Sequence, residues 1–117
     1  MPTIDQDLTI YQNANEPILI AVKDDNDDPM DLTLATDICW ILSKGDIEIV
    51  RYDLADIELA IAAADDTDDG ILIDLPTTIT GVLELGRLYR HQAWVTITAI
   101  SKPVSVGAVT VERGDGC

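Results

Sequence analysis

The chain contains no phenylalanine, and aromatic residues make up only 4% of its 117 residues. Its bulk comes instead from Ile, Leu and Val, whose branched side chains pack well on the half-buried surface of a β-sheet. No apolar run approaches the ~20 residues that a membrane-spanning helix needs. The first seven residues carry neither the basic nor the apolar region of an export signal. We therefore expect a protein that is made in a cytoplasm and leaves it only as part of something larger.

Basic residues are scarce. The chain has seven Lys and Arg residues and 22 Asp and Glu residues, so its formal net charge is −15. Nucleic-acid binding draws its affinity from Lys and Arg that displace counterions from phosphates, so this surface argues against a nucleic-acid partner. It disfavours anionic membrane lipids for the same reason. The acidity either keeps the protein soluble by self-repulsion or serves a partner with a basic face or bound divalent cations.

Motifs with catalytic chemistry are missing. The chain has no Gly-x-Ser-x-Gly, no phosphate-binding loop and no Gly-x-Gly-x-x-Gly. Its one histidine, His91, lies in the middle of a predicted strand, where we expect a packed structural role. One histidine and two cysteines are too few ligands for a zinc site. We therefore predict no catalytic residue, no cofactor and no enzymatic activity.

Only two cysteines are present, and a cytoplasmic origin argues against a disulfide between them. Cys39 lies in an apolar run and is expected to be a small buried residue. Cys117 ends the chain after a glycine-containing tail and is expected to be exposed. It is either an incidental terminal residue or a candidate for an intermolecular disulfide, formed after the assembly meets an oxidising environment.

What the chain does contain is a series of short apolar runs separated by polar, turn-rich stretches, the pattern of an all-β sandwich or barrel. The longest alternating segment, Tyr89–Thr98, places His91 on an apolar face and Trp94 on the opposite face with Arg90 and Gln92. A large aromatic residue on an outward face is an anchor for a protein partner, so Trp94 is a candidate interface residue. We predict strands at residues 8–11, 17–22, 38–43, 47–52, 57–63, 71–75, 89–98 and 104–111, with the last turn at 101–103.

Two segments also fit helix patterns. Ile57 and Ile61 are four residues apart, although we prefer a strand there. Residues 77–85 have room for one helical turn, and Gly81 argues against a longer helix. The length and the apolar content of 47% indicate a single globular domain over residues 1–117. We predict an antiparallel, immunoglobulin-like β-sandwich of about seven or eight strands, with an extended N-terminal segment at about residues 1–16 and a flexible C-terminal tail at about 112–117.

One acidic turn resembles the start of a calcium-binding loop. Asp65, Thr67 and Asp69 take the alternate ligand positions, and Gly70 takes the sixth. The twelfth position, where such loops carry a bidentate Glu, is Pro76, and the flanks are predicted strands rather than helices. These three residues are therefore weak candidates for metal ligands, and a solvated turn is the preferred interpretation.

Taken together, these segments resemble the small all-β structural proteins of tailed bacteriophages, particularly the immunoglobulin-like modules of baseplate upper proteins, collars, fibres and head decoration. The similarity spans most of the chain and rests on strand and turn patterns rather than on a chemical signature. The segments that carry it are residues 18–25, 29–33, 38–42, 69–75, 85–93 and 107–114. Residues 77–85 depart from the pattern because they lack an Asp-Thr turn, and the Cys117 tail is not part of it.

The resemblance implies a non-enzymatic virion structural protein of the neck or collar, tail or baseplate, fibre or head surface. Such a protein acts by self-assembly and by docking to other virion proteins, and a homo-oligomer is expected. Met1–Glu16 and Lys102–Cys117 are the candidates to reach across to a neighbour, and a Cys117 disulfide would then lock the assembly. The alternative, motivated by the acidic turns, is a calcium-dependent binding or adhesin module.

Overall fold

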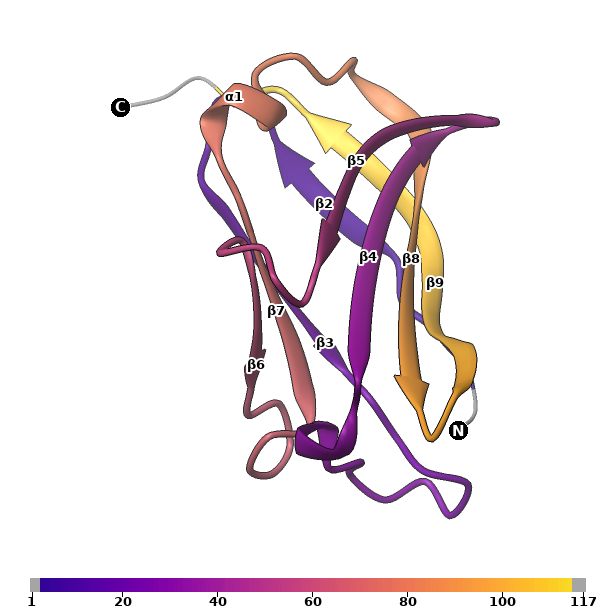
Figure 1. Cartoon of the computed structure of the whole chain (residues 1–117). Coiled ribbons are helices and arrows are strands. Elements are labelled where there is room, and N and C mark those ends of the chain that lie inside the picture. Colours follow the sequence, from indigo (N-terminus) through magenta and orange to yellow (C-terminus); the bar gives the residue numbers. More distant parts are fainter. Residues whose placement is uncertain (1–2, 115–117) are drawn as a thin grey trace.

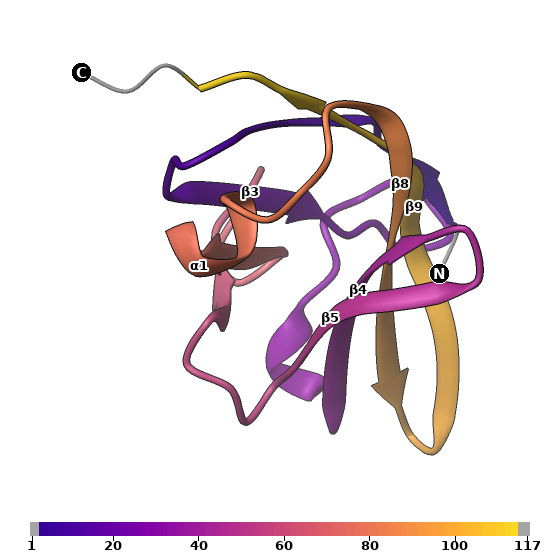
Figure 2. The same cartoon turned by 90° about the horizontal axis from the view of Figure 1, so that it is seen from above.

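The structure, a computed structural model that describes residues 3–114, is a two-layer β-sandwich (Figure 1). Viewed along its long axis, β3 and α1 lie on one side and β8 and β9 on the other (Figure 2). The smaller layer has the order β3 (Glu16–Ala21), β7 (Gly70–Leu75) and β6 (Leu59–Ala62). The larger layer has the order β9 (Ile100–Glu112), β8 (Gly86–Ile97), β4 (Asp37–Lys44) and β5 (Ile47–Asp53). Two short N-terminal strands, β1 (Ile4–Asp5) and β2 (Leu8–Tyr11), both pair with β9. The predicted all-β sandwich is confirmed.

The N-terminal segment belongs to this larger sheet. β1 and β2 pair in parallel with β9, with Ile4 opposite Ser105 and Leu8 opposite Val109. Residues 4–11 thus pair within their own chain, and the expectation that residues 1–16 reach across to a neighbour stays a prediction. Residues 102–112 likewise lie in β9, between β8 and the N-terminal strands. The side chain of Ile10 in β2 is completely buried in this arrangement.

The turn before β9 is not where the sequence pattern placed it. Residues 101–103 lie inside the strand, and the chain reverses at Thr98 and Ala99, which have φ values of 53° and 62°. Positive φ at both central residues is the geometry of tight hairpin loops that match strand twist. Pro103 lies beside a shift in the β8–β9 register, between Ala93 and Trp94. Such irregularities tolerate a residue without an N–H group.

The structure shows which element forms in each of the two segments that also fit helix patterns, residues 57–63 and 77–85. The strand predicted at residues 57–63 exists as the shorter β6, while Ile57 lies outside it and is 94% exposed. The helical turn expected within residues 77–85 is α1 (Thr77–Thr80). A second short helical turn, η1 (Leu32–Leu34), begins after Asp31, whose side chain accepts the backbone N–H of Thr33 at 3.0 Å.

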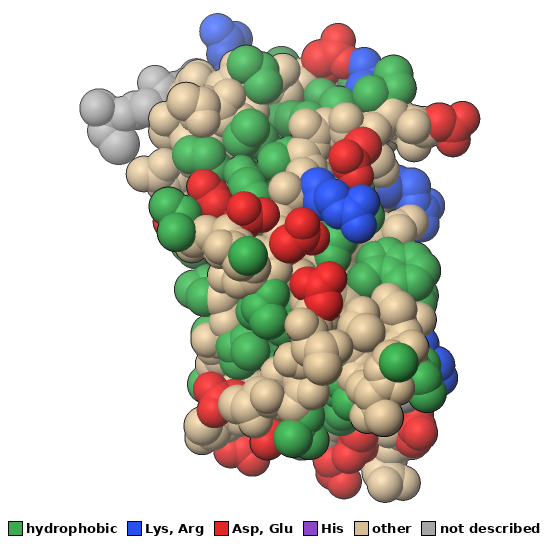
Figure 3. Space-filling view, viewed as in Figure 1, with side chains coloured by type: hydrophobic (Ala, Val, Ile, Leu, Met, Phe, Trp, Pro, Cys, Tyr) green, Lys and Arg blue, Asp and Glu red, His purple; other side chains and the backbone are tan. Residues whose placement is uncertain are grey.

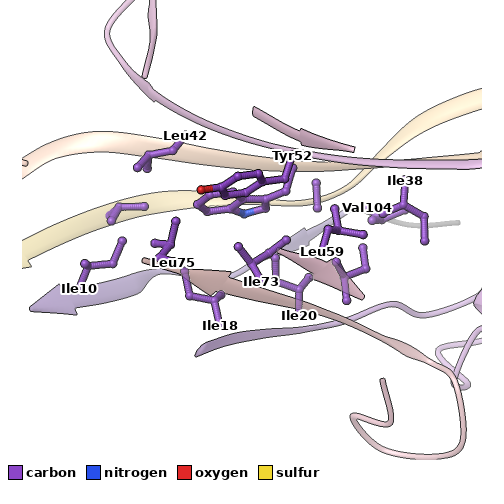
Figure 4. Close-up of a cluster of buried hydrophobic side chains, with 14 of the residues drawn as sticks. Ile10, Ile18, Ile20, Ile38, Leu42, Tyr52, Leu59, Ile73, Leu75 and Val104 are labelled. Atoms are coloured by element: carbon purple, nitrogen blue, oxygen red, sulfur yellow. The ribbon is translucent and has the colours of Figure 1, made fainter. Parts of the chain in front are cut away.

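The core lies between the two sheets and consists mainly of branched aliphatic side chains (Figure 4). Trp40 is fully buried, and its ring stacks on Tyr52 with centroids 6.4 Å apart and planes inclined by 9°. Burying one large apolar side chain contributes roughly 1.5–3 kcal/mol. The core residues labelled with Tyr52 in the figure are Ile10, Ile18, Ile20, Ile38, Leu42, Leu59, Ile73, Leu75 and Val104.

Candidate functional site

The outer face of the larger sheet is the candidate site. The alternation along β8 points His91 into the core and leaves Trp94 half-buried on the outside. Trp94 lies opposite Cys39 of β4 on one side and Pro103 of β9 on the other. Its indole N–H donates to the side-chain oxygen of Gln92 at 3.0 Å, which fixes the ring on the face. The predicted outward position of Trp94 is confirmed, and its role in an interface stays a prediction.

A pocket of about 350 Å³ opens beside Trp94 on this face. The pocket is lined by side chains from four neighbouring strands, which include apolar, hydroxyl, amide and charged groups. A concave surface that combines an aromatic wall with a few polar groups is typical of recognition sites. Its lining residues are Asp37, Cys39, Ile41, Arg51, Gln92, Trp94, Thr96 and Ser101.

Arg51 supplies the positive charge of the pocket. Its guanidinium lies 3.5 Å from Glu48 and 3.7 Å from Asp53, and all three side chains are about half exposed. Ion pairs in such solvent contribute only ~0–1 kcal/mol to stability. The same pairs orient the guanidinium over the sheet. Arg51 therefore adds little to stability, and its main effect here is a positive charge in the pocket lining.

Cys39 forms part of the pocket wall but is only 5% exposed. Burial raises the pKa of its thiol above the ordinary value, and Arg51 only partly opposes this effect. The thiol therefore stays protonated at neutral pH. Because the thiolate is the reactive form of cysteine, Cys39 is in its unreactive form. The expectation of a small buried residue is confirmed.

The three candidate calcium ligands are not arranged as a cation site. Asp69 is buried, and its carboxylate oxygens accept the backbone N–H groups of Ala64 at 2.7 Å and Asp65 at 2.9 Å. The side chain of Asp65 pairs with Lys23. Thr67 stays exposed. Within residues 3–114, no three His, Cys, Asp or Glu side chains are grouped to hold a metal ion. The acidic turn is thus organised by its own backbone hydrogen bonds.

The charge of Asp69 follows from the same contacts. Burial raises the pKa of its carboxyl, but the backbone hydrogen bonds from Ala64 and Asp65 outweigh burial, and the pKa is lowered overall. The ionised carboxylate therefore closes the turn. A pattern of alternating acids could not reveal this role, because the sequence does not say which carboxylate turns inward.

Neither ring nitrogen of His91 is free for acid–base chemistry. The indole N–H of Trp40 donates to Nδ1 at 3.4 Å, and Nε2 lies 2.6 Å from the carbonyl oxygen of Gln6. Burial lowers the pKa of this imidazole, so it is neutral, with its proton on Nε2 donated to Gln6. The predicted packed, structural histidine is confirmed.

Cys117, the predicted interface and disulfide residue, lies outside the described residues, and its role stays a prediction. No helix in the described part of the chain is long and apolar enough to cross a bilayer. Comparison with protein-family models and with curated proteins finds no match to this chain.

Proposed function

We propose that this chain is a non-enzymatic structural module of a tailed-bacteriophage particle that docks to other virion proteins through the outer face of its larger sheet. The sequence resemblance supports the virion assignment. The docking assignment rests on one observation: Trp94 is half-buried, is held in place by Gln92, and forms a wall of an open pocket. A partner side chain that enters this pocket would contact the indole, which is the arrangement of an interface anchor.

The composition of the face also supports docking. Its lining combines Trp94 and Ile41 with the neutral side chains of Gln92 and Thr96, and it carries one acidic residue on β4 and Arg51 on β5. Aromatic residues and arginine are enriched in protein interfaces. A stable contact needs about 800 Å² from each partner, so the partner has to cover several strands around the pocket.

We also propose that the sandwich is immunoglobulin-like. Its pairing order, β3-β7-β6 facing β9-β8-β4-β5, supports this class. Trp40 occupies a buried position on β4, as the core tryptophan of such domains does. The hydroxyl oxygen of Tyr89, near the start of β8, accepts the backbone N–H of Glu84 at 2.8 Å, like a tyrosine corner. His91, two residues later, takes the position at which antibody domains carry a disulfide cysteine.

The test compares incorporation of three versions of the chain into particles. Wild type, Trp94→Ser and the control Ile57→Ser are supplied in trans during phage production, and particles are purified on a density gradient. Ile57 is a matched control because it is more exposed than Trp94 and does not line the pocket. Quantitative mass spectrometry then measures the number of copies per particle, and circular dichroism checks that each version folds.

We expect wild type and Ile57→Ser in the particle fraction at equal copy number, and Trp94→Ser in the soluble fraction. Absence of every version from purified particles would contradict the virion assignment. Incorporation of Trp94→Ser at the wild-type level would leave the virion assignment standing and contradict docking through this face.

A further inference from the structure

The two ends of the sandwich differ strongly in charge. At one end, the β3–β4 connection (residues 22–36) and the β6–β7 connection (residues 63–69) carry nine aspartates and one lysine, a net charge of −8. Red side chains gather along this lower end in Figure 3. We call these residues the acidic end. More than half of the net charge of −15 is therefore concentrated here.

At the opposite end, residues 44–47 of the β4–β5 hairpin lie at the same end of the sandwich as α1, the connection after it and the first residues of β8 (residues 77–88), as Figure 1 shows. Two basic and two acidic residues in these segments cancel to a net charge of zero. Four large apolar side chains are exposed here: Ile47 at 67%, Val82 at 72%, Leu85 at 52% and Leu88 at 46%. We call these residues the apolar end.

The apolar end is held by contacts to the rest of the fold. Glu84 pairs with Lys44 through its side chain and donates its backbone N–H to Tyr89. The carbonyl oxygen of Leu83 accepts a hydrogen bond from the Gln12 side chain at 2.7 Å, and the Leu83 side chain is buried. The exposed Val82 and Leu85 flank these anchored residues, so little conformational entropy is lost when a partner covers them.

We infer that two copies of this chain associate through their apolar ends. Electrostatics selects this orientation, because contact between acidic ends would bring together two net charges of −8. Contact between apolar ends brings together two surfaces of zero net charge and leaves the two acidic ends far from each other. The molecule is 41 Å long, several times the ~8–10 Å screening length at physiological salt. Two like patches meeting in this way give a closed, two-fold dimer.

This contact is separate from the proposed docking face. None of the four apolar-end residues lines the pocket beside Trp94. A dimer joined at its apolar ends therefore presents two docking faces to the particle. Dimerisation through the apolar ends does not depend on docking through the Trp94 face, so the Trp94→Ser variant should dimerise as the wild type does.

The test measures the molar mass of the full chain by light scattering after size-exclusion chromatography, with reductant present to exclude a Cys117 disulfide. The measurement covers protein concentrations from about 1 μM to 1 mM, the range of weak to moderate interfaces. Wild type is compared with Leu85→Asp, which adds a carboxylate to the apolar end, and with Ile57→Asp, which adds the same charge to an isoleucine outside it. Each sample is measured at low and at high sodium chloride.

We expect a concentration-dependent dimer that high salt preserves or strengthens, because the contact is apolar and the whole-molecule repulsion is screened. Leu85→Asp should weaken dimerisation by about tenfold or more, since it sets like charges against each other in the interface, whereas Ile57→Asp should match wild type. A strict monomer throughout would overturn the inference. So would a dimer that dissociates in high salt, or one that Leu85→Asp leaves unchanged.

Discussion

The Nε2 atom of His91 lies 2.6 Å from the carbonyl oxygen of Gln6, a contact that joins the N-terminal segment to the middle of β8. The opposite ring nitrogen receives the indole N–H of Trp40. The imidazole therefore bridges an edge of the larger sheet and the centre of the core. Because one nitrogen must donate and the other must accept, only the neutral Nε2–H form satisfies both partners.

This bridge predicts a stability that depends on pH. Burial lowers the pKa of His91 in the folded chain, and Arg90 adds to this effect, while the Gln6 carbonyl and Asp7 oppose it. The unfolded chain takes up a proton on this residue near pH ~6.5. Below that pH the unfolded state binds more protons, so stability falls as the pH drops from about 6.5 through the lower folded-state pKa. The slope is at most about 1.4 kcal/mol per pH unit for one proton.

Urea unfolding between pH 8 and pH 5, followed by circular dichroism, measures this dependence. The variant His91→Gln provides the control, because a glutamine amide can donate to Gln6 but does not titrate. It should be less stable at pH 7.5 and should show a flatter profile below pH 6.5. Parallel profiles for the two chains would show that another group carries the pH dependence.

Gly107 of β9 lies directly against the backbone of Gln6, between the segments that pair with β1 and β2. A β-carbon there would lie 2.0 Å from the carbonyl oxygen of Gln6, and the obstacle is backbone rather than a flexible side chain. We predict that Gly107→Ala lowers the free energy of unfolding by about 1–3 kcal/mol. Gly45→Ala is the comparison, since a β-carbon there meets nothing and only its positive φ is strained. Equal melting temperatures for the two variants would contradict the close approach at Gly107.

Ser105 carries the one buried side-chain oxygen without a hydrogen-bond partner among residues 3–114. Removing this hydroxyl relieves a desolvation cost, so Ser105→Ala should be neutral or stabilise the fold by up to about 1 kcal/mol. Thr80 is also buried, but its hydroxyl donates to the carbonyl oxygen of Ala14 at 2.8 Å. Thr80→Val should therefore destabilise by about 1 kcal/mol. Thermal melts of both variants check the contrast, which fails if Ser105→Ala is the more damaging change.

Calcium should not bind the acidic turn measurably. Both oxygens of the Asp69 carboxylate accept backbone hydrogen bonds, and Asp65 pairs with Lys23. A cation would have to break these contacts to gain its ligands. Isothermal calorimetry with calcium at about millimolar concentration, the weak limit of protein sites, should detect no binding heat. A saturable signal lost in Asp65→Asn would revive the calcium-dependent alternative.

Periodicity along single strands predicted much of this fold. The alternation of Tyr89–Thr98 correctly placed His91 inside and Trp94 outside, because side chains alternate strictly along a strand. The strand at residues 8–11 was predicted, but its pairing with β9 was not, since alternation within a strand does not identify the partner strand. β1 has only two residues, too few for a pattern. The pocket was missed for a related reason: it brings Cys39 and Arg51 beside Trp94 from three strands, and only the register joins them.

The central claim is that the outer face around Trp94 is covered by a partner in the assembled particle. Hydroxyl-radical footprinting with mass spectrometry measures this directly, by comparing oxidation of Trp94 in the free chain and in purified particles. Trp40 is fully buried and serves as the internal reference in both samples. We predict that Trp94 is oxidised in the free chain and protected in the particle, while Trp40 is protected in both. Equal oxidation of Trp94 in the two samples would contradict the account.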